Sequence, residues 1–178
     1  MPLYMKPKAP VTLQDMQAGM RDHYEGTPFD ITGDLGAGPF NMPYRLSPLS
    51  FKYEGKEYFN ERPISTFQTA FTFVAQLRSF LPNAIGGVMW FGTDDSNMVV
   101  YTPVYCCTTT IPDCYAAEYA DPVTFSWKSS FWVFNWVANM IYPKYSMVID
   151  DMRKVQGELE TRIYNQSKEV EKEALASI

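Results

Sequence analysis

The chain has 178 residues, enough for one domain with a hydrophobic core, and 16% of them are aromatic while 20% are charged, which excludes disorder for most of its length. Its formal net charge is −5, so neither nucleic acid nor an anionic membrane surface is expected as a partner. Asn135 and Asn139 interrupt the most apolar stretch, and neither a signal peptide nor a membrane-spanning helix is predicted. The localisation is left open.

The N-terminal part predicts a helix over residues 12–24. Thr12 and Asp15 have the spacing of a capping box, and apolar side chains then recur at helical intervals up to a stop at Gly26. Residues 26–48 are rich in Gly and Pro, which predicts a long irregular loop.

The middle third, residues 51–105, predicts an antiparallel β-sheet. Two short aromatic runs joined by Glu-Gly indicate a hairpin over residues 51–59. Residues 65–78 alternate with period two, which is the strongest strand signal of the chain. Two further strands are predicted over residues 85–91 and 98–105, joined by a turn.

Two helices are predicted over residues 126–176. Ser126 or Ser129 caps the first, which is apolar nearly all round and is therefore expected to be buried on more than one side. Pro143 ends or kinks it. The second helix is amphipathic, and its end beyond Gln166 is expected to fray or to lean on something outside this chain. These elements predict an α+β fold in a single domain over residues 1–178.

Three cysteines form an odd set, so no disulfide framework is predicted. Cys106 and Cys107 could form a thiolate–imidazole pair with His23, but buried, inert thiols at the end of an apolar strand are the favoured interpretation. Cys114 is expected to pack, and His23 is expected to cap the first helix or to pin a loop.

Two adjacent acids, Asp94 and Asp95, could bind a cation or a substrate amine. A turn with solvated carboxylates is favoured, because neighbouring residues of an extended chain point to opposite sides. The sequence contains no zinc, calcium or nucleotide motif, so no metal or cofactor is expected. The aromatic side chains of Trp127, Trp132 and Trp136 are expected to fill the core.

Several blocks of the sequence resemble the dipeptidase A family, which is related to the secernins and belongs to the N-terminal-nucleophile hydrolase superfamily. The resemblance extends to about Leu159. The blocks are RDHYEGTPFD at 21–30, DLGAGPF at 34–40, YFNERPIST at 58–66, IGGVMWFG at 85–92, YTPVYC at 101–106 and FSWKSSFWVFNWVAN at 125–139.

The resemblance implies a sandwich of two antiparallel sheets between helical layers, and hydrolysis of a dipeptide by an N-terminal cysteine. Residue 1 is Met and residue 2 is Pro, neither of which supplies a thiol nucleophile. The chain is therefore expected to be the C-terminal portion of a cysteine dipeptidase, inactive alone, with the missing N-terminal half as its partner. A non-catalytic binding or structural domain from the same family is the alternative, and self-association into a homo-oligomer is a further expectation.

For substrate binding, the sequence suggests Asn60 and Arg62, just before the long strand, and Ser65 or Thr66 at its start. The guanidinium of Arg62 could bind a substrate carboxylate bidentately. The alternative is a surface ion pair between Arg62 and a neighbouring glutamate.

Overall fold

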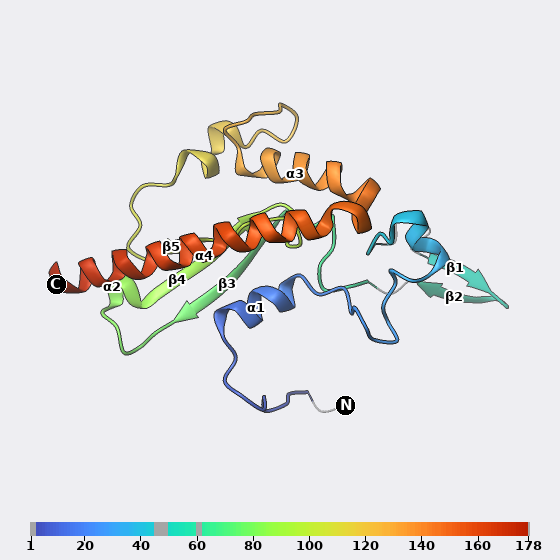
Figure 1. The fold of residues 1–178 in the computed structure, drawn as a ribbon, viewed down its shortest axis with the longest axis horizontal. Coiled ribbons are helices and arrows are strands. Elements are labelled where there is room, and N and C mark those ends of the chain that lie inside the picture. The colour runs from blue at the N-terminus through green and yellow to red at the C-terminus, as the bar shows by residue number, and fades with distance from the viewer. Residues whose placement is uncertain (1–2, 45–49, 60–61, 178) are drawn as a thin grey trace.

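The computed structural model describes residues 3–44, 50–59 and 62–177. Within these ranges the chain forms a three-stranded antiparallel sheet with helices packed on it, and a separate two-stranded hairpin (Figure 1). The α+β class with antiparallel sheets is confirmed. The elements are α1 (Leu13–Met20), η1 (Leu35–Phe40), β1 (Ser50–Tyr53), β2 (Lys56–Phe59), β3 (Phe71–Leu77), α2 (Asn83–Gly86), β4 (Gly87–Thr93), β5 (Thr102–Tyr105), η2 (Asp113–Tyr115), η3 (Ala117–Tyr119), α3 (Ser130–Ile141), η4 (Tyr142–Lys144) and α4 (Tyr145–Ser177).

Helix α1 begins where the sequence predicts and ends earlier. Thr12 and Asp15 form the capping box, with the Asp15 amide 3.1 Å from the Thr12 hydroxyl. The helix stops at Met20 instead of residue 24; Arg21 is its C-cap and binds the carboxylate of Glu160 on α4, and Tyr24 has a positive φ angle of 63°, which does not fit a helix. The predicted irregular loop after α1 does contain one ordered turn, η1.

The hairpin of β1 and β2 matches its prediction. Its register pairs Ser50 with Phe59 and Tyr53 with Lys56. The two turn residues, Glu54 and Gly55, both have positive φ angles, 48° and 75°, as a two-residue turn between twisted strands requires.

The three-stranded sheet has the order β3-β4-β5; β3 and β5 are shorter than the sequence predicts, while β4 has the predicted length but begins two residues later, after α2. Residues 65–70 were expected to begin β3. Their backbone groups instead form hydrogen bonds within the segment or with other segments; for example, the Ser65 amide donates to the Asp22 carbonyl at 3.1 Å. Residues 98–101 were expected in β5. Side chains take the place of a neighbouring strand there: Glu160 accepts from the Tyr101 amide, and Gln156 donates to the Val99 carbonyl.

The main core lies on one face of this sheet, where α1 and α4 pack. Its buried members are Val74, Val88, Trp90, Val99 and Tyr101. In Figure 1, α4 runs along the length of the sheet.

The opposite side of the sheet carries apolar side chains that remain accessible. Phe71, Phe73 and Leu77 of β3 are exposed, while Met89 and Phe91 of β4 are half-buried. We call these five residues the open sheet face. Strand β3 pairs with β4 alone among the described residues, so its other edge is unpaired as well.

Helix α3 is capped by Ser129, whose hydroxyl accepts a hydrogen bond from the Trp132 amide. The expectation that this helix is buried on several sides is wrong, since Met140 is 61% exposed and Trp136 is 49% exposed. Trp127 is also largely exposed, so the tryptophans do not all fill the core.

Pro143 interrupts the helical path in η4, as predicted, and α4 then continues to Ser177. The expectation that its end frays or leans on something outside the chain is wrong, because Arg78 beside the sheet forms a bidentate ion pair with Glu171 at 2.7 and 2.8 Å. Tyr105 donates to the same carboxylate. Among the described helices, none combines the length and the apolar character needed to span a bilayer.

Candidate functional site

Five side chains from separate segments meet in the interior beside the sheet: His23, Tyr44, Ser65, Asp95 and Ser96. All five are buried, and we call them the buried polar network. The segment after α1 supplies the first, the segment after η1 the second, the approach to β3 the third, and the turn after β4 the last two. Four loops are therefore joined at one end of the sheet.

Tyr44 is the centre of this network. Its hydroxyl lies 3.1 Å from Nε2 of His23 and 3.1 Å from Oδ2 of Asp95. It also lies 2.7 Å from the hydroxyl of Tyr142, at the end of α3. Burial and the negative charge of Asp95 raise the pKa of Tyr44 well above its usual value, so the phenol stays protonated.

Asp95 is the acid of the network, and its pKa is strongly raised. Burial raises its pKa to about 7, and the neighbouring charge of Asp94 acts in the same direction. Hydrogen bonds from the Asn97 amide, Tyr44 and Ser65 oppose this rise, because they stabilise the ionised form. The carboxyl group can therefore gain or lose a proton near neutral pH. The side chains that form hydrogen bonds with it, Tyr44 and Ser65, are themselves buried.

His23 is held at both ring nitrogens. Nδ1 lies 2.9 Å from a carboxylate oxygen of Glu25, and Nε2 contacts the Tyr44 hydroxyl. Burial lowers the pKa of His23, while Glu25 opposes that shift. The expectation that His23 pins a loop agrees with these contacts, and neither ring nitrogen is left for a thiol.

The substrate-binding residues suggested by the sequence lie in different surroundings. Ser65 belongs to the buried network and bonds to Asp95 and Ser96, so its hydroxyl faces the interior. Thr66 is half-buried, and Arg62 is exposed. Asn60 lies outside the described residues. The structure thus brings Ser65 into a cluster and leaves Arg62 at the surface, and their roles in substrate binding stay predictions.

Two groups in this region were misjudged or missed from the sequence. Asp94 and Asp95 were expected to be solvated in a turn, but they are 3% and 1% exposed. The loop that follows η1 folds over them and inserts Tyr44, which the sequence did not single out. The polar run Thr-Asp-Asp-Ser-Asn directly after an apolar strand was the available signal, because polar groups that follow a buried strand need partners.

The three thiols do not form a catalytic centre. Cys106, Cys107 and Cys114 are exposed, so the expectation of buried cysteines is wrong. Within the described ranges no hydrogen bond joins any of them to a histidine. Partial desolvation of its sulfur and the charge of Asp113 raise the pKa of Cys114, although the residue as a whole is exposed, and this disfavours the reactive thiolate.

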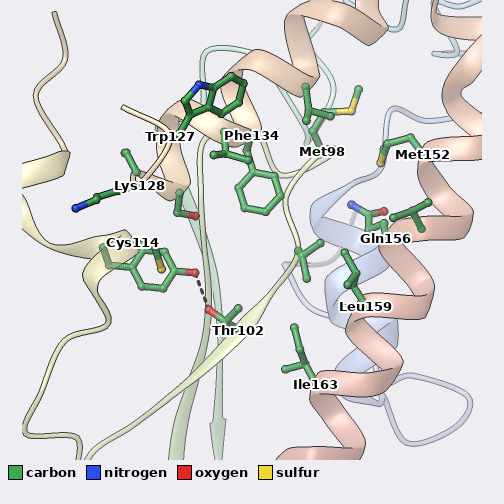
Figure 2. A pocket seen from close by; sticks show the side chains of 17 residues that line it. Met98, Thr102, Cys114, Trp127, Lys128, Phe134, Met152, Gln156, Leu159 and Ile163 are labelled. Carbon is green, nitrogen blue, oxygen red and sulfur yellow. Dashed lines mark hydrogen bonds between the residues drawn. The ribbon is translucent and has the colours of Figure 1, made fainter. Parts of the chain in front are cut away.

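An apolar groove of about 520 Å³ lies between α3 and α4, above the segment that leads into β5 (Figure 2). Tyr115 and Thr102 close one end of it through a hydrogen bond of 2.6 Å between their hydroxyls. Its walls are almost entirely aliphatic and aromatic, so it offers packing surface and little polar chemistry. The groove-lining residues include Met98, Val133, Phe134, Val137, Met152 and Leu159.

No group of three or more His, Cys, Asp or Glu side chains suited to a metal ion occurs among the residues that the structure describes.

Comparison with known proteins places the chain in a family of peptidases. The model of peptidase family C69 matches residues 1–158. Probable dipeptidase A of Streptococcus pyogenes serotype M1 is 25% identical over 141 residues, which cover 79% of this chain and 26% of that protein. Dipeptidase A of Lactobacillus helveticus is 27% identical over 152 residues, or 84% of this chain and 26% of that protein.

A probable dipeptidase of Salmonella dublin is 28% identical over 104 residues, 58% of this chain and 19% of that protein. No solved structure matches the chain. The chain spans about a quarter of the length of the curated relatives that it matches most fully. With a family model matched along most of its length, the chain belongs to peptidase family C69.

Proposed function

We propose that this chain forms part of a hydrolase that cleaves dipeptides, and that the catalytic nucleophile comes from a segment outside these 178 residues. The observation that carries the proposal is the family match over residues 1–158 in a chain whose histidine contacts Glu25 and Tyr44 and none of its own thiols in the described ranges. The relatives named dipeptidase A support dipeptides as the substrate class.

The contacts of His23 argue against a self-sufficient cysteine hydrolase. A thiol nucleophile needs a neighbouring base or cation that stabilises the thiolate. Both ring nitrogens of His23 are engaged by Glu25 and Tyr44. Cys106 instead lies beside Gly87, where its Sγ would be 2.7 Å from a Cβ added at that glycine. The 178-residue chain is accordingly inactive alone.

The open sheet face supports a longer protein as the functional unit. Phe71 is 57% exposed and Leu77 is 83% exposed, although both are large apolar residues on the same face of one strand. A second sheet stacked about 10 Å away would bury this face, as in a two-sheet sandwich. The N-terminal half of the dipeptidase would contribute that sheet, and the N-terminal-nucleophile arrangement of the whole enzyme is part of the same proposal.

Arg62 is the residue of this chain best suited to bind the carboxylate of a dipeptide, because its side chain is exposed and its guanidinium can donate two parallel hydrogen bonds. Ser65 would act indirectly, since its hydroxyl is bonded to Asp95 and anchors the segment that follows Arg62. Asn60 is proposed as a second polar contact beside Arg62.

The proposal is tested by dipeptide hydrolysis with the 178-residue chain alone, at high protein concentration, together with the rate of iodoacetamide labelling of its thiols. No hydrolysis and labelling no faster than for a simple alkyl thiol are expected. Hydrolysis that disappears in Cys106→Ala or Cys107→Ala would refute the proposal. A chain that binds dipeptides and never supports hydrolysis, even with the rest of a dipeptidase, would identify it as a non-catalytic binding domain.

A further inference from the structure

A carboxylate without a charged partner lies at the end of β4. Asp94 is 3% exposed, and its Oδ2 has no hydrogen-bond partner among the described residues. Its Oδ1 accepts a hydrogen bond from Nδ2 of Asn135 at 3.2 Å, and the backbone amide of Asp95 also stabilises the carboxylate. The other buried unpaired side-chain atom in the described ranges is Nε of Arg78, but there the ion pair with Glu171 compensates the charge. Asp94 has no such compensation.

The backbone holds Asp94 in a conformation that non-glycine residues seldom adopt, with φ at 77°. Its amide donates to the carbonyl of Ala70 at 2.7 Å, which fixes the turn at this point. Burial raises the pKa of Asp94. A positive group beside Oδ2 would offset that rise, because an opposite charge favours the ionised carboxylate.

A path of polar side chains leads from Asp94 to the surface along α3. Asn135 is half-buried and donates to Asp94, while its own Oδ1 accepts from the exposed Asn139 at 3.1 Å. For a small ligand to reach Oδ2 of Asp94 along this path, the two amide side chains would have to rotate. Oδ1 of Asn135 would then be released from Asn139 as a second acceptor.

The position of Asp94 relative to the predicted carboxylate-binding residue fits a short zwitterion. Ser65 bonds to Asp95, the neighbour of Asp94, at 3.3 Å. Arg62 precedes Ser65 by three residues, which span at most about 10 Å of extended chain. The two termini of an extended dipeptide are separated by about 7 Å. Arg62 and Asp94 therefore belong to segments that meet at the same end of the sheet.

We propose that Asp94 binds the α-ammonium group of a dipeptide, with Asn135 as a second acceptor, while Arg62 binds the carboxylate at the other end. This inference rests on the proposed function and assigns its substrate a free amino terminus. An ammonium group suits the site, because it brings one positive charge and three donors to a carboxylate oxygen that has none.

The test is binding of alanyl-alanine, N-acetyl-alanyl-alanine and alanyl-alanine amide to the 178-residue chain, followed by calorimetry and by the backbone amide resonance of Asp94. The wild-type chain is expected to bind the free dipeptide at least about tenfold more tightly than the acetylated one. Asp94→Asn keeps the size of the side chain and removes its charge. It is expected to bring this ratio close to one while leaving the preference for the free carboxylate.

The matched control is Asp151→Asn, which removes an exposed acid on α4 and is expected to bind all three ligands like the wild type. A wild-type preference for the free amine that survives in Asp94→Asn would overturn the inference, and so would the absence of binding up to about 10 mM dipeptide. Because the readout is binding, the amine site stands or falls separately from hydrolysis. Amine-selective binding without hydrolysis by any assembled enzyme would refute the proposed catalysis alone.

Discussion

Replacement of Asp95 by Asn is expected to change how the stability of the chain depends on pH. The pKa of Asp95 is raised from 3.8 to about 7, mainly by burial. A rise of about three units corresponds to about 4 kcal/mol, since each unit is worth about 1.4 kcal/mol. As the pH rises from about 4 to 7, Asp95 ionises in the unfolded chain but not in the folded one, so the folded state loses up to about 4 kcal/mol.

An Asn side chain at this position cannot ionise and keeps the main contacts. Its oxygen, placed at Oδ1, accepts from the Asn97 amide and the Ser65 hydroxyl, and its NH2 group, placed at Oδ2, donates to the hydroxyl of Tyr44. The free energy of unfolding of Asp95→Asn is therefore expected to exceed that of the wild type at pH 8, and the advantage is expected to vanish toward pH 4. Urea unfolding followed by tryptophan fluorescence between pH 4 and 8.5 measures the difference directly.

Other titrations cancel in this comparison. The pKa of His23 is lowered by burial, so its contribution to stability is present above pH 6.5 and is lost as the pH falls through its folded-state pKa. Both proteins share that loss. Asp151→Asn, an exposed acid, serves as the control and is expected to give no pH-dependent difference. A difference between Asp95→Asn and the wild type that stays constant with pH would refute the reasoning.

Three further substitutions test the packing. Tyr44→Phe removes the hydroxyl that contacts both His23 and Asp95. Urea unfolding at pH 7 is expected to show a free energy of unfolding lower by about 1–3 kcal/mol. An unchanged unfolding midpoint would contradict the central place of Tyr44 in the network. Arg78→Ala removes the ion pair that anchors α4 at Glu171. Amide hydrogen exchange around residue 171 is therefore expected to become at least about fivefold faster, while exchange in the first turns of α4 stays unchanged. Equal exchange rates in both proteins would show that the anchor is not needed. Phe73→Asp places a charge on the open sheet face. The free energy of unfolding is expected to stay within about 0.5 kcal/mol of the wild-type value, while association with the N-terminal half is prevented. Normal association in size-exclusion chromatography would argue against that face as the contact.

The sequence was sufficient where the structure depends on local chemistry. The capping box at Thr12, the two-residue turn at Glu54 and Gly55, and the break at Pro143 all act within a few residues, and each was found as predicted. The period-two pattern of residues 65–78 located β3, although only residues 71–77 of that range pair with β4.

The errors concern contacts between distant segments. Asp95 is buried because Tyr44, 51 residues earlier in the chain, folds over it. Residues 98–101 are kept out of the sheet by side chains of α4, and no local pattern announces such contacts. The exposure of Trp136 has the same origin, because an apolar helix implies burial only if a partner covers each of its sides.

The most direct test of the account is dipeptide hydrolysis by this chain mixed with the N-terminal half of a dipeptidase that begins with a free cysteine. Each part alone, and a mixture in which that cysteine is alanine, are the controls. Hydrolysis in the intact mixture alone is the expected result. Hydrolysis by the 178-residue chain alone, or a stable complex of the two halves that cleaves no dipeptide, would contradict the account.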